Sequence, residues 1–294
     1  FYEQTGAADK AASSYDAALK ASPSDVNAAM GLIRICLLRK ENAKALELAK
    51  ATRKLAPDDP QVGYVLSRAA FATGDRSWAL SLLQESAGKL PDDPNVLYGL
   101  AEAAYSQGQV SAAEVALQST LAAHPAATLA AQARQLLEMI GLAKDPAQAT
   151  AAMATIQGRL QSDPSDVPAL MALAATQEQR PDPAAAQETY KKALNVYPEF
   201  SPAQRNLAIL YSRNKTDDPK AVDLAMRARQ AYPDDAKVAK ALGILLLRAG
   251  NFSRAASLLQ ESAGQLTTDA EVMFYLGMAQ HNLKDQAGST RSLQ

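Results

Sequence analysis

Hydrophobic residues recur along this chain at the spacing of amphipathic helices, in pairs of helices separated by a short turn. Residues 167–200 show the pattern most clearly. The inward positions of the two helices predicted there are Leu170, Leu173, Ala174 and Gln177, then Ala186, Tyr190, Ala193 and Leu194. A turn over 180–183 separates the helices, and Pro198 ends the second one. The pattern predicts a unit of helix, turn and helix.

Prolines that follow the second helix of each pair set a register along the chain. They are Pro23, Pro57, Pro91, Pro125, Pro164, Pro198 and Pro233. The first four are 34 residues apart, and the same spacing separates Pro164 from Pro198. One pair of helices cannot bury its apolar face alone, so the sequence predicts repeated pairs stacked into one elongated array.

Residues 128–166 depart from this register, because the spacing from Pro125 to Pro164 is 39 residues. The extra residues fall near 141–146. We expect a longer first helix over 128–142 and a single second helix over 146–161, whose inward residues are Ala152, Met153, Ile156 and Leu160. The predicted organisation is regular units over 1–127, an irregular longer unit over 128–166 and regular units over 167–294. The first and last units are expected to be truncated. A boundary between two separately moving arrays at 128–166 is the alternative.

Composition agrees with stacked helices. Of the 294 residues, 48% are hydrophobic and only 5% are aromatic, which suits closely packed Ala- and Leu-rich helices and argues against a strand-rich fold. The net charge of −1 gives no basic excess to hold nucleic acid. No apolar run approaches the ~20 residues that span a bilayer. We therefore expect no nucleic-acid partner and no direct membrane insertion.

Residues suited to catalysis or metal binding are scarce. The chain has one cysteine, Cys36, in an apolar helix segment, and two histidines, His124 and His281. His124 precedes Pro125 at a helix end, where a cation near the C-terminal carbonyls is favourable. No P-loop, dinucleotide fingerprint or Ser/His/Asp set can be argued. We expect no enzyme activity, no cofactor and no metal in these residues.

Turn and capping residues recur in the same register. Gly74, Gly108 and Gly250 each precede a second helix by a residue or two, where a helix end favours glycine. Acidic pairs at 58–59, 92–93 and 234–235 each precede a first helix. They predict carboxylates that cap helix N-termini.

The order of large and small residues in the unit 167–200 resembles the tetratricopeptide repeat, a helical hairpin of 34 residues. The resemblance is carried by Leu173, Ala174, Ala186, Tyr190, Ala193 and Pro198. Its register covers almost the whole chain. It implies an all-α fold, a right-handed superhelical solenoid of stacked helix-turn-helix hairpins. Long Ala- and Leu-rich arrays of this kind also resemble those of bacterial exopolysaccharide secretion proteins.

In that family the first helices line a concave surface, and six positions of each first helix face a bound peptide. In the second unit these positions hold Asn27, Met30, Gly31, Arg34, Leu37 and Leu38. In the third they hold Gln61, Tyr64, Val65, Arg68, Phe71 and Ala72. The resemblance therefore implies a partner-binding groove whose candidate residues are Arg34, Tyr64, Arg68, Phe71, Asn95, Tyr98, Glu102, Tyr105, Arg205, Asn206, Arg213, Lys237, Lys240, Arg248, Tyr275 and His281.

Two patches emerge among these candidates. The N-terminal patch combines four aromatic residues with two arginines, which are typical of binding hot spots: Tyr64, Phe71, Tyr98, Tyr105, Arg34 and Arg68. The C-terminal patch is cationic and would favour an acidic segment: Arg205, Arg213, Lys237, Lys240 and Arg248. The alternative for both is that the aromatic residues pack between neighbouring first helices and the cations form a solvated face.

The resemblance implies a protein–protein interaction scaffold that binds a protein or peptide segment in the concave groove. An envelope component of a bacterial polysaccharide or protein export system is one alternative. A regulatory array attached to an enzyme domain outside this chain is another. Because both ends cut through a hairpin, we expect more protein beyond both termini, with the bacterial periplasm or cytoplasm as the compartment.

Overall fold

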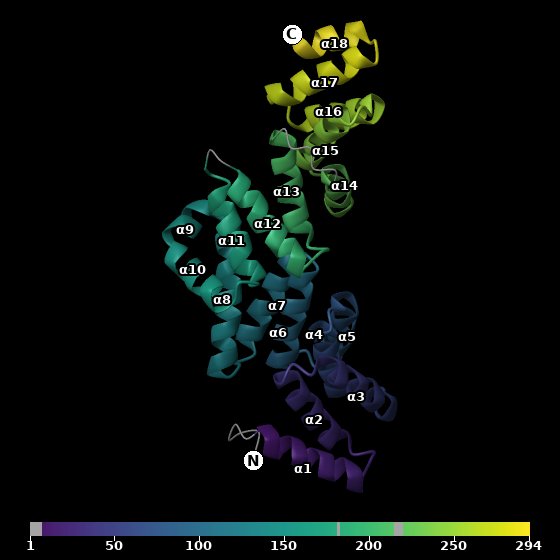
Figure 1. Cartoon of the computed structure of the whole chain (residues 1–294), viewed down its shortest axis with the longest axis vertical. Coiled ribbons are helices and arrows are strands. Elements are labelled where there is room, and N and C mark those ends of the chain that lie inside the picture. The colour runs from purple at the N-terminus through teal and green to yellow at the C-terminus, as the bar shows by residue number, and fades with distance from the viewer. Residues whose placement is uncertain (1–7, 181–182, 215–219) are drawn as a thin grey trace. The chain divides into compact units, whose positions relative to one another are not determined.

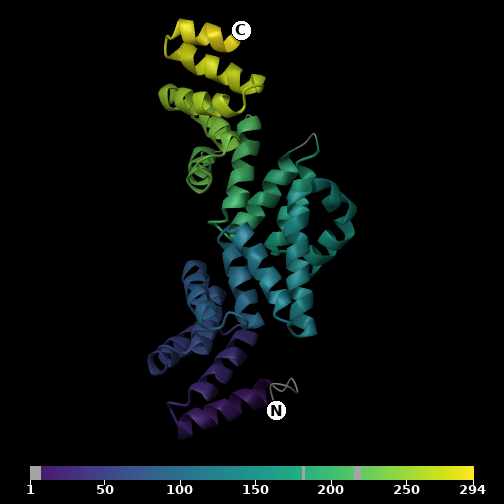
Figure 2. The same cartoon turned by 180° about the vertical axis from the view of Figure 1, so that it is seen from behind.

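The structure, a computed structural model, describes residues 8–180, 183–214 and 220–294. In these residues the chain forms eighteen helices and no strand. It divides into two compact units, Phe1–Glu138 and Met139–Gln294, and the division falls inside α8 (Ala127–Lys144). The helices of both units can be followed in Figure 1 and, from behind, in Figure 2. The prediction of an all-α fold of repeated helical hairpins is confirmed.

Unit 1 is a series of hairpins, each made of a first and a second helix. Its first helices are α2 (Val26–Leu38), α4 (Pro60–Ala72) and α6 (Pro94–Ser106). Its second helices are α1 (Ala8–Ala21), α3 (Asn42–Leu55), α5 (Arg76–Lys89) and α7 (Val110–Ala122). Each first helix packs against its own second helix, and α4 also packs against α2 and α6. The first helices therefore form one continuous layer within this unit.

Unit 2 repeats the arrangement. Its first helices are α11 (Val167–Gln177), α13 (Ser201–Arg213), α15 (Ala236–Arg248) and α17 (Ala270–Asn282). Its second helices are α12 (Ala184–Val196), α14 (Ala221–Ala231), α16 (Phe252–Gln265) and α18 (Gln286–Leu293). Ala174 and Ala186, the predicted small residues of one hairpin, are fully buried. Of the turn predicted between them, residues 181–182 lie outside the described residues.

Helix ends follow the chemistry that the register predicts. Pro23, Pro57 and Pro91 each lie two residues beyond the end of a second helix. Asp59 and Asp93 accept hydrogen bonds from the second and third backbone N–H groups of α4 and α6. Because these N–H groups have no partner within the helix, each cap stabilises its helix by about 1 kcal/mol.

The turn between first and second helix places one residue in the left-handed region. Gly74, Gly108 and Gly250 have φ of 93°, 75° and 81°, as their predicted role requires. Lys40 and Lys284 occupy the same register with φ of 60° and 64°. In the turn at Gly74, the backbone N–H of Asp75 donates to the carbonyl oxygen of Ala70 and so satisfies an acceptor at the end of α4.

The predicted irregular unit has the expected long first helix and an unexpected second one. α8 has 18 residues, against 13 in α2, α4 and α6. The single second helix predicted over 146–161 is wrong, because the chain forms α9 (Pro146–Ala151) and α10 (Met153–Ser162) with a break at Ala152. There the backbone turns to ψ 16°, and Ala149 and Ile156 both reach a core shared with Met139.

Candidate partner-binding groove

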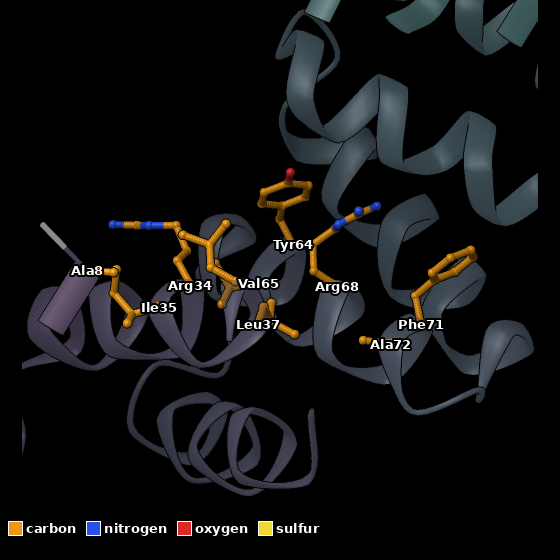
Figure 3. Close-up of a pocket in the computed structure, with 10 residues that line it drawn as sticks. Ala8, Arg34, Ile35, Leu37, Tyr64, Val65, Arg68, Phe71 and Ala72 are labelled. Atoms are coloured by element: carbon orange, nitrogen blue, oxygen red, sulfur yellow. The ribbon is translucent and has the colours of Figure 1, made fainter. Parts of the chain in front are cut away.

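A cavity of about 660 Å³ lies along the first helices α2 and α4 of unit 1. It is lined by Ala8, Arg34, Ile35, Leu37, Leu38, Tyr64, Val65, Arg68, Phe71 and Ala72. Eight of these ten occupy groove positions that the sequence predicts for the second and third units. Ala8, at the start of α1, and Ile35 were missed. Figure 3 shows Tyr64, Arg68 and Phe71 along α4, with Arg34 of α2 at the end of the group opposite Phe71.

Helical periodicity explains why these side chains meet. Tyr64, Arg68 and Phe71 are four and three residues apart, so they follow one face of α4. Arg34 and Leu38 are one turn apart on α2 and share a face in the same way. Because α2 and α4 pack side by side, the two stripes become the walls of one cavity.

Arg68 is held in place by two neighbours that the sequence had also selected. Its Nη1 donates to Glu102 Oε2 of α6 at 2.5 Å, and its guanidinium lies 5.8 Å from the centre of the Phe71 ring. Arg76 approaches the same ring at 5.9 Å. Burial would lower the pKa of Arg68, but the adjacent Glu102 carboxylate raises it above its usual value. Arg68 thus stays charged, with its charge matched by Glu102.

Tyr64 is half-buried and leans toward α6. A Cβ added at Gly99 of α6 would lie 3.4 Å from Tyr64 Cε2, so the ring lies close to the backbone of α6. Burial raises the pKa of the Tyr64 phenol. The phenol therefore stays neutral at physiological pH and can donate one hydrogen bond into the cavity.

The cavity wall is mainly apolar. Seven of its ten residues are alanine or carry a larger aliphatic or phenyl side chain, and the other three are Arg34, Tyr64 and Arg68. Among the described residues that line it there is neither a carboxylate nor an amide or aliphatic hydroxyl side chain. Leu38, which lines it, is 75% exposed. Such a surface stabilises a complex by covering apolar area, with Arg34 as a charged group within reach.

The remaining N-terminal candidates lie outside this cavity. Tyr105 is only 4% exposed and belongs to the core, so its predicted availability to a partner is wrong. Its burial agrees with the alternative, in which the aromatic residues pack between neighbouring first helices. Tyr98 is half-buried and Asn95 is exposed near the start of α6.

Two of the C-terminal cations, Arg205 and Lys240, pair with carboxylates of unit 2. Arg205 contacts Asp235 Oδ2 through Nε at 2.7 Å and Nη2 at 2.6 Å. Lys240 Nζ lies 2.8 Å from Asp269 and 2.6 Å from Glu271. Burial would lower the pKa of Lys240, but these two carboxylates raise it. These positive charges are therefore already matched by carboxylates of unit 2.

Arg248 also binds within unit 2. Its guanidinium donates to the carbonyl oxygens of Tyr211 at 3.2 Å, Ser212 at 2.8 Å and Asn214 at 2.9 Å. These carbonyls lie at the C-terminal end of α13, where an arginine satisfies orphan acceptors and the helix dipole favours a cation. Arg248 thus serves as a cap supplied by the neighbouring hairpin.

A second, smaller cavity lies beside these pairs. It has a volume of about 100 Å³, and its charged lining residues are Arg213, Lys237, Lys240, Asp269 and Glu271. Arg213 and Lys237 are exposed. Three cations face two carboxylates here, so the net positive charge is smaller than the sequence suggests.

Asn206 belongs to a partly buried chain of polar side chains in unit 2. Its Nδ2 donates to the hydroxyl of Tyr190 at 3.0 Å, and its Oδ1 accepts from Arg205 at 3.0 Å. The Tyr190 hydroxyl in turn donates to Glu178. Tyr190 is 1% exposed, and burial strongly raises its pKa, with the Glu178 carboxylate adding to the shift. This chain joins α12 and α13 and gives Asn206 a structural role.

The last two candidates lie on α17. Tyr275 is half-buried, and its ring meets that of Phe274 edge-on at 5.4 Å. His281 is exposed in the last turn of the helix. Their part in partner binding stays a prediction, as it does for Asn95, Arg213 and Lys237.

Among the described residues no three His, Cys, Asp or Glu side chains lie close enough together to hold a metal ion. Cys36 is 1% exposed, and burial raises the pKa of its thiol. His124 lies just beyond α7 with φ of 52°, a backbone conformation found at helix ends. No helix in the described ranges has the length and hydropathy of a bilayer span.

Comparison with protein families gives matches at both ends of the chain. One family model described as tetratricopeptide repeat matches residues 3–69 and 70–140, and a second with the same description matches residues 240–289. Together these segments cover more than half of the chain. No curated protein sequence matches it.

Comparison with solved structures gives distant likenesses. Yeast Tom70 is 14% identical, with 91% of this chain and 67% of that chain covered and a TM-score of 0.38. A chain of the APC/C hetero-tetramer Cut9–Hcn1 is 16% identical, with 91% and 52% covered and a TM-score of 0.43. MamA is 18% identical, with 68% and 95% covered and a TM-score of 0.37. The chain spans about half the length of the Cut9–Hcn1 chain that it matches.

Proposed function

The chain belongs to the tetratricopeptide repeat family, and from that premise we propose that it is a protein-interaction scaffold that binds a segment of a partner protein in the groove between α2 and α4. Arrays of such repeats present extended surfaces suited to binding, and the fold itself names no partner. The proposal concerns unit 1. In unit 2 three of the candidate cations, Arg205, Lys240 and Arg248, are engaged within the chain.

The observation that supports this proposal is the cavity of about 660 Å³ lined by Arg34, Tyr64, Arg68 and Phe71. Its size is typical of cavities that take a ligand of several side chains. Aromatic and arginine residues in a concave apolar setting are those that dominate binding energies at interfaces. Arg68 is already fixed by Glu102 and Phe71, so little side-chain entropy is lost when a partner covers it.

Export and enzyme-regulatory roles would use the same scaffold with different neighbours. No contact in the described residues favours one of them over the other. The test of function therefore addresses the groove itself.

Two exposed aliphatic residues of unit 1 allow a matched test. Leu38 lines the groove and is 75% exposed, whereas Val115 lies on the second helix α7 and is 62% exposed. Neither residue is buried, so both Leu38→Gln and Val115→Gln should leave the fold intact, which circular dichroism checks. The wild type and both variants are immobilised and exposed to lysate of the source cells, and bound proteins are quantified by mass spectrometry.

We expect a set of proteins bound by wild type and by Val115→Gln but reduced about tenfold on Leu38→Gln, because a covered leucine is worth roughly 1.5–3 kcal/mol. Equal recovery on all three proteins would contradict the groove as the binding site.

A further inference from the structure

The wall of the groove on α4 carries two aromatic rings at a fixed interval. Tyr64 and Phe71 are seven residues apart, so they lie on the same face of the helix, about 10 Å apart along its axis. Arg68 lies between them, four residues after Tyr64 and three before Phe71. Figure 3 shows the three side chains following one another along α4. A ligand that lies along α4 therefore meets a ring, a guanidinium and a second ring, in that order.

Contacts within unit 1 hold both rings in place. The centre of the Phe71 ring lies 5.8 Å from the guanidinium of Arg68 and 5.9 Å from that of Arg76. The Tyr64 ring lies close to α6, where a Cβ added at Gly99 would be 3.4 Å from it. Rings that are fixed before binding lose little side-chain entropy when a partner covers them. The interval between the two rings is therefore already set in the free protein.

This interval discriminates between backbone conformations of a ligand. In the polyproline II helix, residues i and i+3 share a face and lie about 9 Å apart, which matches the two rings. In a strand, residues that share a face lie about 7 Å or about 14 Å apart, and neither distance matches. An α-helix also matches, because its residues i and i+7 share a face about 10 Å apart. The spacing thus leaves two conformations, polyproline II and α-helix.

The hydrogen-bond donors on the same wall favour polyproline II. The Arg68 side chain is 32% exposed, and a guanidinium carries five N–H groups, so it can bind a ligand while its Nη1 stays on Glu102. Because Glu102 already balances its charge, a neutral carbonyl suits Arg68 as a further acceptor. The Tyr64 hydroxyl is a second donor. The carbonyl groups of polyproline II have no partner within the segment, whereas those of an α-helix are already bonded.

Proline is the residue type that satisfies both requirements. Its ring is apolar and packs on aromatic side chains, as in other grooves that bind proline-rich segments. Its φ is fixed near the value of polyproline II, so a proline-rich segment loses little backbone entropy on binding. Proline also has no backbone N–H, so it brings no further donor to a wall whose polar groups are themselves donors.

We propose that the α4 wall of the groove binds a proline-rich segment of the partner protein in the polyproline II conformation. Two prolines three residues apart pack on Tyr64 and Phe71, and a backbone carbonyl between them accepts a hydrogen bond from Arg68. This inference rests on the proposed function and specifies its ligand.

The probe is a pair of fluorescently labelled ten-residue peptides that contain only alanine and proline, in equal composition. One has prolines at positions 2, 5 and 8, so that they share one face of polyproline II. The other has them at positions 2, 4 and 9, where no two share a face. We expect the first peptide to bind the intact chain at least fivefold more tightly in fluorescence anisotropy, because only its prolines can reach both rings at once.

Three variants locate the binding, and circular dichroism checks the fold of each. Phe71→Ala should weaken binding of the first peptide about tenfold and abolish the difference between the two peptides. Tyr64→Phe keeps the ring and removes the hydroxyl, so it should weaken binding only about threefold. Phe274→Ala is the matched control, because it removes an aromatic side chain that is 52% exposed on the first helix α17. It should leave both affinities unchanged.

Equal affinity for the two peptides, or no binding of either, would overturn the inference. An unchanged affinity of folded Phe71→Ala for the first peptide would overturn it too. The lysate experiment with Leu38→Gln separates this result from the proposed function. If proteins are captured through Leu38 but neither peptide binds, only this inference fails. If Leu38→Gln captures every protein that wild type captures and neither peptide binds, both fail.

Discussion

At the scale of single residues, one backbone position recurs in a left-handed conformation through both units. Glycine occupies it at 74, 108 and 250, and the sequence alone identified those three turns. Lys40 lies 34 residues before Gly74, and Lys284 lies 34 after Gly250, yet neither was recognised. Only the 34-residue register could have identified these two turns, because a lysine gives no local indication of positive φ.

The two lysines therefore offer a stability test. A residue with a side chain is destabilised by about 1–2 kcal/mol in this conformation. Glycine removes that strain, but its more flexible unfolded state offsets part of the stabilisation. We expect Lys40→Gly and Lys284→Gly each to raise the free energy of unfolding by about 1 kcal/mol or less, and Gly74→Ala to lower it by about 1 kcal/mol. Urea unfolding measures all three.

Lys192→Gly is the matched control, because Lys192 is exposed inside α12. Glycine there should destabilise by about 1 kcal/mol. If Lys40→Gly and Lys284→Gly lost as much stability as Lys192→Gly, the left-handed turn would not be strained.

At the scale of helices, the capping aspartates also join neighbouring repeats. Asp235 Oδ1 accepts from the N–H groups of Lys237 and Val238, while its Oδ2 accepts from Arg205 of the preceding first helix. Asp269 caps α17 and binds Lys240 in the same manner. The capping role could be predicted from the sequence for Asp235. The second contact could not, because it depends on how consecutive first helices stack.

This double use explains why the predicted cationic patch of unit 2 is largely neutralised. Arg205 precedes Asp235 by 30 residues, and Lys240 precedes Asp269 by 29. Groove positions were counted within each first helix separately. Such a count takes no account of the aspartate that caps the following first helix. In unit 1 the equivalent contact to Asp93 comes from a neutral residue, Gln61, at 3.0 Å.

The ion pair between Arg205 and Asp235 should make the free energy of unfolding depend on pH. Burial would raise the pKa of Asp235, but the hydrogen bonds from Arg205 hold it below its usual value of about 4. Because the folded-state pKa is the lower one, this stabilisation is present above about pH 4 and is lost as the pH falls through the folded-state value. Its size is about 1 kcal/mol, since both side chains are partly exposed.

Asp235→Asn keeps a capping residue but removes the charge. The variant should be less stable than wild type at pH 7, and the difference should shrink as the pH is lowered below 4. Urea unfolding across this range measures it. Arg205→Gln should reproduce the effect, and the double variant should lose less than the sum of the two single losses. A difference that stays constant with pH would rule out the ion pair as its cause.

At the scale of the whole molecule, the sequence predicted the hairpin register and the all-α array but not the local break in the irregular unit. The 39-residue spacing located the longer α8 correctly. It did not reveal that the second helix breaks at Ala152, because alanine is a strong helix former and gives no local indication of a break. We still propose that residues 128–166 form one irregular unit between two sets of regular units.

The candidate site was partly predictable for the same kind of reason. Positions counted along α2 and α4 located eight of the ten residues around the cavity, since one face of a straight helix follows from spacing alone. The burial of Tyr105 and the pairing of Lys240 depend on neighbouring hairpins, and spacing within one helix does not contain that information.

The central claim is that a partner segment binds between α2 and α4, and methyl NMR tests it most directly. Ile35, Leu37, Leu38 and Val65 place methyl groups on the cavity, whereas Ile244 and Leu247 lie on the first helix α15 of unit 2. On addition of a bound peptide or partner segment, we expect the largest methyl shifts at the four cavity residues and none at Ile244 and Leu247. Shifts at α15 with the cavity methyls unchanged would contradict the claim.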